Sequence, residues 1–145
     1  MDQAKNLERF LIAQENAYAD ALREVRGGRK LTHWMWYIFP QLRGLGRSNL
    51  AWFFGIDILE EAKAYLEHPV LGTRLREITQ AALDQPECDA LKLFGRPDDL
   101  KFRSCMTLFV CASDGDPLFE NALNKFFDGK RDMKTVNMIE NGDYS

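Results

Sequence analysis

The stretch Thr32-His33-Trp34-Met35-Trp36-Tyr37-Ile38-Phe39-Pro40-Gln41 is the most distinctive part of this chain, and a turn rich in glycine and arginine, residues 43–48, follows it. The stretch holds two of the three tryptophans and one of the two histidines. Large aromatic side chains usually pack in a core, so the apolar residues here favour packing and a binding surface about equally. The polar side chains among them need hydrogen-bond partners, which are either each other or a ligand. This aromatic stretch, residues 32–41, is therefore the first candidate for a site.

The length and composition are those of one compact domain. The chain has 145 residues, of which 46% are hydrophobic, and this is enough for a core without a partner, a metal or disulfides. We expect a single domain over residues 1–145, with residues 141–145 as a frayed tail. No apolar run approaches the roughly 20 residues that span a bilayer, and the first residues lack the order of a secretion signal. A cytoplasmic protein without membrane association is the expectation.

Charge and cysteine content restrict the function classes. The formal net charge of -3 argues against a general nucleic-acid coat, although basic side chains near the aromatic stretch could attract a phosphate. We therefore expect a small anionic, nucleotide-like ligand as partner, and nucleic acid only as a modified substrate. Cys88, Cys105 and Cys111 form no Cys-x-x-Cys pair, so we expect free thiols, no metal and no cofactor.

Apolar residues recur at helical spacing through most of the chain, and Val/Ile-rich alternating runs are lacking. The pattern predicts a mainly α domain of five or six helices, or an α+β domain if a small sheet is present. Asp57 and Glu60 have the spacing of a capping box, and His68 is expected to cap a helix junction rather than to catalyse. Pro40 excludes a long helix through the aromatic stretch. The other expected features are a helix over residues 6–25 and helix starts at Asp98-Asp99, Asp116-Pro117 and Asp132.

Five segments resemble the bacterial domain of unknown function 1810: HWMWYIFPQ, GLGRS, EEAKAYLEHPVLGTRL, FGRPDDLKFRSCMTLF and FFDGKRD, in this order. The resemblance covers residues 7–132. This family is similar, more distantly, to the YbiA or NADAR superfamily, whose members act on ADP-ribose and related ribosides. The resemblance implies a single compact YbiA-like domain and a metal-free N-glycosidase for an ADP-ribose-like or nucleotide-like substrate. The Trp-Pro-Thr-x-Glu-His segment of that superfamily has no counterpart beside His33, so no catalytic residue is carried over from it.

The residue types that N-glycosidic cleavage needs occur in and near the aromatic stretch. Cleavage requires a nucleophile or carboxylate at the anomeric carbon, an acid for the leaving base and an aromatic wall. Trp34 and Trp36 could stack on the base, and His33 could act as acid or base. Lys101 or Lys30 could attack an opened ribose as an amine, although a solvated surface lysine is the commoner case. The further ligand-binding candidates are Gln41, Arg43, Gly44, Gly46, Arg47, Ser48 and Arg103.

Two classes of function follow from these residues. One is an N-glycosidase, and the other is a non-catalytic module that binds a nucleotide-like ligand or a protein through an aromatic groove. No Ser-His-Asp order, metal-ligand cluster or nucleotide-binding loop of recognised spacing is present. We expect His33, Trp36, Gln41 and the turn at residues 43–48 to line one concave pocket, which Lys101 or Arg103 approaches. The oligomeric state is not predicted.

Overall fold

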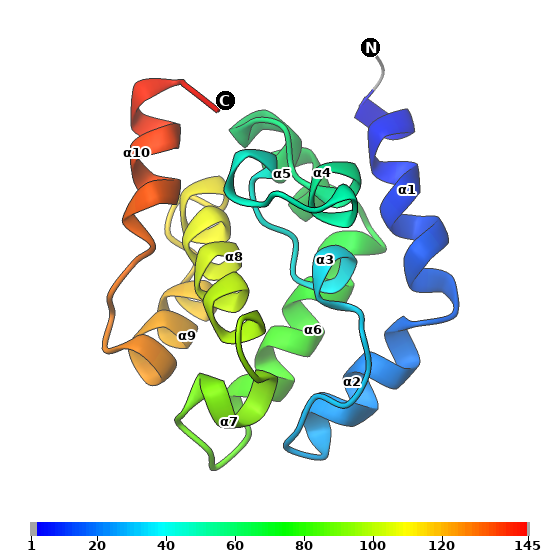
Figure 1. The fold of residues 1–145 in the computed structure, drawn as a ribbon, viewed down its shortest axis with the longest axis vertical. Helices are drawn as coiled ribbons and strands as arrows, with labels where there is room; N and C mark the ends of the chain where they lie inside the picture. Colours follow the sequence, from blue (N-terminus) through cyan, green and yellow to red (C-terminus); the bar gives the residue numbers. More distant parts are fainter. Residues whose placement is uncertain (1–2, 145) are drawn as a thin grey trace.

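The computed structural model describes the backbone of residues 3–144 and the side chains of residues 7–144. Figure 1 shows this part of the chain as a group of helices packed on one another. This part of the chain contains ten α-helices, one 3-10 helix and no strand, and an isolated parallel bridge joins Leu42 to Ile56. The prediction of a mainly helical single domain is confirmed. The predicted number of five or six helices is wrong, because the shortest helices have too few turns to show a period.

The helices are α1 (Gln3–Glu15), α2 (Tyr18–Arg26), α3 (Met35–Ile38), η1 (Arg43–Leu45), α4 (Asn49–Phe54), α5 (Leu59–Glu67), α6 (Leu71–Leu83), α7 (Ala90–Phe94), α8 (Asp98–Ala112), α9 (Pro117–Phe127) and α10 (Met133–Asn141). Helix α8 is the central element, since it packs against α5, α7, α9 and α10 (Figure 1). Ten of its 15 residues are buried, so other elements cover most of its circumference. None of the helices in the described part of the chain combines the length and apolar character needed to cross a bilayer.

The helix expected over residues 6–25 is two helices in the structure. A turn closed by the bond from the Ala17 N–H to the Gln14 carbonyl, at 3.2 Å, separates α1 from α2. The two helices pack on different partners, because α1 contacts α3 and α5 while α2 contacts α6. Gln14 is buried at this turn and donates to the Tyr37 carbonyl at 2.7 Å and to the Tyr65 hydroxyl at 3.0 Å. A continuous amphipathic pattern does not reveal a change of partner.

Several helix ends are those that the sequence predicts. Asp116 accepts from the Leu118 N–H at the start of α9, where Pro117 is the first helical residue. Asp132 accepts from the Thr135 N–H at the start of α10. His68 ends α5, and its Nδ1 accepts from the N–H groups that open α6. The predicted junction role of His68 is therefore confirmed.

Two predicted caps are wrong. Asp98 and Asp99 lie inside the first turn of α8, and Pro97 occupies the cap position. The capping box of Asp57 with Glu60 does not form either, because the N-cap of α5 is Ile58. The Asp57 N–H donates instead to Glu61 Oε1 at 2.7 Å. Each shift is of one residue, which is the usual error of a boundary taken from sequence.

The aromatic stretch passes through the middle of the molecule and contributes the single turn of α3. Its residues Trp34, Met35, Ile38 and Phe39 are all buried. Glu24, from α2, holds the loop before it by accepting from the N–H groups of Leu31 and Thr32, the Thr32 hydroxyl and the Trp34 indole. These four hydrogen bonds fix the position of the loop relative to α2. This fixes the direction in which the next tryptophan, Trp36, projects.

Candidate functional site

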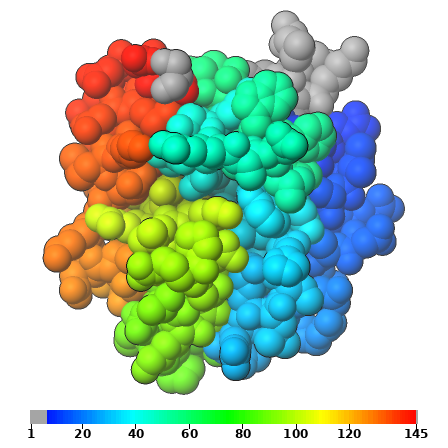
Figure 2. All heavy atoms as spheres, in the orientation of Figure 1, coloured from blue at the N-terminus to red at the C-terminus, as the bar shows by residue number. Residues whose placement is uncertain are grey.

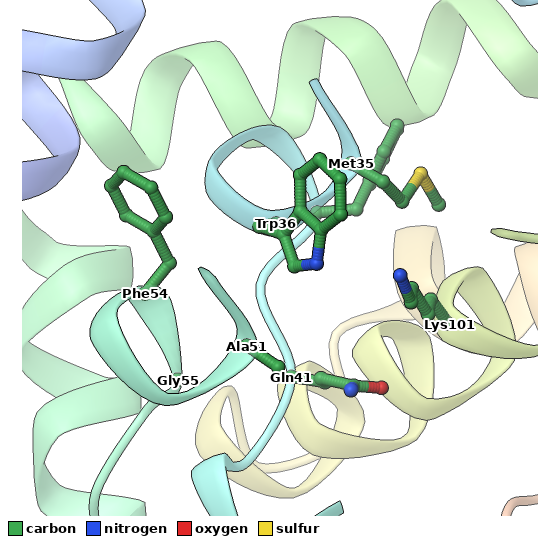
Figure 3. A pocket seen from close by; sticks show the side chains of 8 residues that line it. Met35, Trp36, Gln41, Ala51, Phe54, Gly55 and Lys101 are labelled. Atoms are coloured by element: carbon green, nitrogen blue, oxygen red, sulfur yellow. The ribbon is translucent and has the colours of Figure 1, made fainter. Parts of the chain in front are cut away.

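Two adjoining hollows lie where the aromatic stretch meets α4 and α8. We call the first the inner recess (Figure 3); it is lined by Met35, Trp36, Phe39, Gln41, Ala51, Phe54, Gly55 and Lys101. The second is the outer groove, lined by Gln41, Leu45, Gly46, Pro97, Leu100, Lys101, Ser104, Asp132 and Lys134. Figure 2 shows the chain segments that form the groove on one face, with η1 in cyan to teal, α8 in yellow-green and α10 in orange-red to red. Gln41 and Lys101 belong to both hollows, so we treat them as one cleft.

The volumes of the two hollows set what each can hold. The inner recess has a cavity volume of about 10 Å³, which is the space of one water molecule or one ligand atom. The outer groove has about 270 Å³, close to the roughly 300 Å³ at which small-molecule pockets begin. A ring does not fit the recess. A ligand therefore has its bulk in the groove and reaches the recess with one atom.

Trp36 is the most unusual residue of the cleft. Its indole nitrogen is buried and has no hydrogen-bond partner within residues 3–144. Figure 3 shows this nitrogen facing the space bounded by Lys101 and Gln41. The side-chain amide of Gln41 also makes no hydrogen bond in the part of the chain that the structure describes. Buried donors are nearly always paired in folded proteins, so we expect the Trp36 indole N–H to meet an acceptor in the recess, either a water molecule or a ligand atom.

Lys101 supplies the positive charge of the inner recess. Its Nζ lies 4.6 Å from the centre of the Trp36 ring and 3.6 Å from Asp98 Oδ1. An ammonium over the face of an indole is an attractive arrangement, worth about 0.5 to 2 kcal/mol depending on its exposure. The lysine is thus held at the junction of recess and groove. The inner recess is thus lined by an N–H donor, an amide and a cation.

Four of the residues proposed from sequence come together here, namely Trp36, Gln41, Gly46 and Lys101. Gly46 lines the groove, and it also packs closely on Ala51, since a Cβ at this position would collide with the Ala51 side chain. The structure does not place the other proposed residues in the cleft. Trp34 is only 1% exposed, and its indole N–H donates to Glu24 Oε1, so its ring is a core element. His33 is exposed, and its carbonyl accepts from the Tyr37 hydroxyl at 3.2 Å.

Apart from Gly46, three of the four proposed residues in the turn 43–48 make contacts that stabilise the local structure. Arg43 donates to the Trp52 carbonyl at 2.7 Å and pairs with Asp57 at 3.3 Å. Ser48 caps α4 by accepting from the Ala51 N–H. Gly44 packs closely, since a Cβ there would lie 2.7 Å from both the Met138 side chain and the Tyr144 carbonyl. Arg47 is exposed on the surface.

Arg103 is also committed elsewhere. It donates to the carbonyls of Lys130 and Arg131 at 2.9 and 2.7 Å, and so ties the loop between α9 and α10 to α8. The residues that sequence analysis did not propose for a site are mostly apolar walls, such as Phe54 and Leu100. Ser104 lies four positions after Leu100 and three after Lys101 on α8, and this helical spacing is the signal that could have placed Ser104 beside each of them. Among the described residues, no group of three or more His, Cys, Asp or Glu side chains gathers as a metal site.

The fold and the cleft define a small all-helical protein with unpaired donors and a lysine in one recess. The chain belongs to the family described as "Protein of unknown function (DUF1810)", which matches residues 4–139. It is similar to the conserved hypothetical protein Rv1873 from Mycobacterium tuberculosis, known from a crystal structure at 1.38 Å, with 47% identity and a TM-score of 0.91. That match covers 93% of this chain and 96% of the other. No curated protein matches the chain. Neither match extends to the YbiA or NADAR superfamily.

Proposed function

We propose that the protein binds a small anionic, nucleotide-like ligand in the cleft. The observation that carries this proposal is the buried indole N–H of Trp36, which has no acceptor among the described residues and faces the cleft. Leaving a buried donor unpaired costs about 1 to 3 kcal/mol. A ligand oxygen in the recess would recover this free energy, and it would also lie near the Lys101 ammonium.

The outer groove suits the planar part of such a ligand. Its walls include the apolar side chains of Leu45, Pro97 and Leu100, and its volume of about 270 Å³ accommodates one ring system with a sugar more readily than a whole dinucleotide. Lys134 adds a second positive charge at the α10 side. This arrangement supports an elongated ligand whose anionic end points inward.

N-glycosidic cleavage is a second candidate function, favoured by one feature of the cleft. Lys101 provides a primary amine beside the Asp98 carboxylate, at 3.6 Å. In its neutral form this amine could form a bond to the anomeric carbon as the bond to the base breaks and the base leaves with a proton, and water would then hydrolyse the resulting imine. The resemblance to the YbiA or NADAR superfamily, whose members act on such ribosides, supports the same reaction class. Trp36 and Gln41 would then hold the substrate while Lys101 reacts.

Calorimetric titration with ADP-ribose and with AMP tests the binding proposal. We expect the wild type to bind, and the Trp36→Phe variant to bind at least about tenfold more weakly, because it keeps a ring but lacks the N–H donor. Trp52→Phe is the matched control, since Trp52 is 64% exposed on α4 and does not line the cleft. Equal affinities in all three proteins, or no binding by the wild type, would contradict the proposal.

Turnover separates the two candidates. The protein is incubated with ADP-ribosylated nucleic acid and with nucleotide ribosides, and the release of free base or ADP-ribose is measured. We expect Lys101→Arg to keep the positive charge and the binding while abolishing release, because a guanidinium is not an amine nucleophile. Binding without any release by the wild type rejects the glycosidase candidate and leaves ligand binding in place.

A further inference from the structure

A shared carboxylate joins two lysines beside the cleft. Asp98 Oδ2 lies 2.8 Å from Lys30 Nζ, and Asp98 Oδ1 lies 3.6 Å from Lys101 Nζ. The side chains are 19% exposed for Asp98, 7% for Lys30 and 21% for Lys101. Two ammonium groups and one carboxylate leave this Lys30–Asp98–Lys101 cluster with a single net positive charge. Because Lys30 is the closer partner of Asp98, the surplus charge lies at Lys101, where the recess meets the groove.

Each lysine also lies over a tryptophan of the aromatic stretch. Lys30 Nζ is 5.0 Å from the centre of the Trp34 ring, and it donates to the Thr32 carbonyl at 2.6 Å. Lys30 is thus fixed by three contacts within the protein. Lys101 has the longer ion pair and the Trp36 ring, and an ammonium carries three N–H donors, so it retains donors for a ligand.

We propose that the Lys101 ammonium, the Gln41 amide and the Trp36 indole form a subsite for one oxyanion, a phosphate or a carboxylate. In this subsite Asp98 and Lys30 are positioning residues that direct Lys101 toward the recess and keep its charge available. The inference rests on the proposed function and adds the chemical class of the group that is bound. N–H donors around a net positive charge match the acceptor oxygens of an oxyanion. One oxygen fits the recess, and the rest of the anion lies in the groove.

The carboxylate of the outer groove is engaged elsewhere. Asp132 Oδ2 accepts from the Ser104 hydroxyl at 3.1 Å, the Thr135 N–H at 3.2 Å and the Thr135 hydroxyl at 2.5 Å. These bonds hold Asp132 as the N-cap of α10. Its Oδ2 is therefore used within the protein, and Lys134 places a cation on the same side of the groove to offset the carboxylate charge.

The test follows the ¹H–¹⁵N cross-peak of the Trp36 indole, assigned with Trp36→Phe, while inorganic phosphate or acetate is added at constant ionic strength. We expect phosphate or acetate to shift this peak in the wild type, and the stronger of the two identifies the class of anion. Lys30→Met makes the cluster neutral without touching the cleft, and should weaken the affinity about fivefold or more. Lys30→Arg keeps the charge and should restore the affinity. Lys101→Met should abolish the shift.

The double variant Lys30→Met with Asp98→Asn separates charge from positioning. It restores one net positive charge but leaves Lys101 without its ion pair, so we expect its affinity to remain low. Full recovery in the double variant would overturn the positioning role, and an unchanged affinity in Lys30→Met would overturn the role of the cluster. If Lys30→Met does not fold, the Lys101→Met and Lys101→Arg pair decides whether a cation is needed. ADP-ribose binding that is insensitive to all of these variants would reject the inference and leave the proposed function standing.

Discussion

The indole N–H of Trp34 donates to Glu24 Oε1 at 2.9 Å, deep in the core. Trp36, two residues later, has its indole N–H buried and unpaired within the described residues. The two tryptophans therefore have different tasks. The first fixes the loop to α2, and the second is left with a donor that faces the cleft.

Glu24 makes the fold sensitive to acid. Burial tends to raise the pKa of Glu24, but hydrogen bonds from Thr32, Leu31 and Trp34 outweigh burial and lower this pKa from 4.5 to about 2. A pKa that is lower in the folded state gives stability that is fully present above pH 4.5 and is lost as the pH falls toward 2. We expect Glu24→Gln to lower the free energy of unfolding by about 2 to 3 kcal/mol at pH 7, and by much less near pH 2. Urea unfolding of the wild type and the variant between pH 2 and pH 7 measures this difference. An equal loss of unfolding free energy at pH 7 and near pH 2 would contradict the lowered pKa of Glu24.

Arg9 and Glu61 form a largely buried ion pair, with N–O 3.1 Å and side chains 12% and 4% exposed. Arg9 also donates to the carbonyls of Phe53 and Gly55, at the end of α4. We expect Arg9→Leu to lower the free energy of unfolding by about 3 to 5 kcal/mol, because it leaves a buried carboxylate without its cation. Arg23→Ala is the control: its pair with Asp20 is exposed and should contribute at most about 1 kcal/mol. Similar losses in both variants, measured by urea denaturation, would argue against the buried pair.

The three cysteines should differ in reactivity. Cys88 is exposed, Cys111 is half-buried and Cys105 is buried, and all three are free. Burial raises the pKa of Cys111 and raises that of Cys105 well above its usual value, which suppresses the reactive thiolate. A thiol reagent followed by mass spectrometry should label Cys88 first, and Cys105 only after unfolding. Fewer than three thiols in denaturant would reveal a disulfide, and fast native labelling of Cys105 would mean that α8 opens readily.

His33→Ala should leave both stability and ligand affinity nearly unchanged. The ring is exposed and does not line the cleft, and surface substitutions usually change stability by less than about 0.5 kcal/mol. Gln41→Ala is the contrasting variant, because its amide belongs to both the recess and the groove. ADP-ribose titration and thermal melting of the two variants give the comparison. A loss of binding in His33→Ala would return His33 to the list of ligand contacts.

The helical class was predictable because apolar spacing reports on which face of a helix is buried, as for Leu75, Ile78 and Ala82 on α6. The Asp116 and Asp132 caps were predictable for a local reason, since the donors they satisfy lie within three residues. The break between α1 and α2 was not predictable, because it depends on packing against helices that are distant in the sequence, which local periodicity does not report. Within the site, the sequence pointed to Trp36, Gln41 and Lys101. It could not separate Trp34 from Trp36, since the difference lies in whether Glu24, ten residues upstream of Trp34, reaches the indole.

The close contact of Gly44 with Tyr144 joins the site to the end of the chain. A frayed tail over residues 141–145 is the expectation from sequence. In the structure, the Tyr144 hydroxyl accepts from the Leu59 N–H at 3.4 Å, and the Tyr144 carbonyl lies against Gly44 in η1. Helix α10 also gives Asp132 and Lys134 to the groove through its cap and first turn. The C-terminal residues thus buttress one wall of the cleft. We therefore expect removal of Tyr144 to loosen this wall and to weaken ligand binding at the cleft, although the residue itself lines neither hollow.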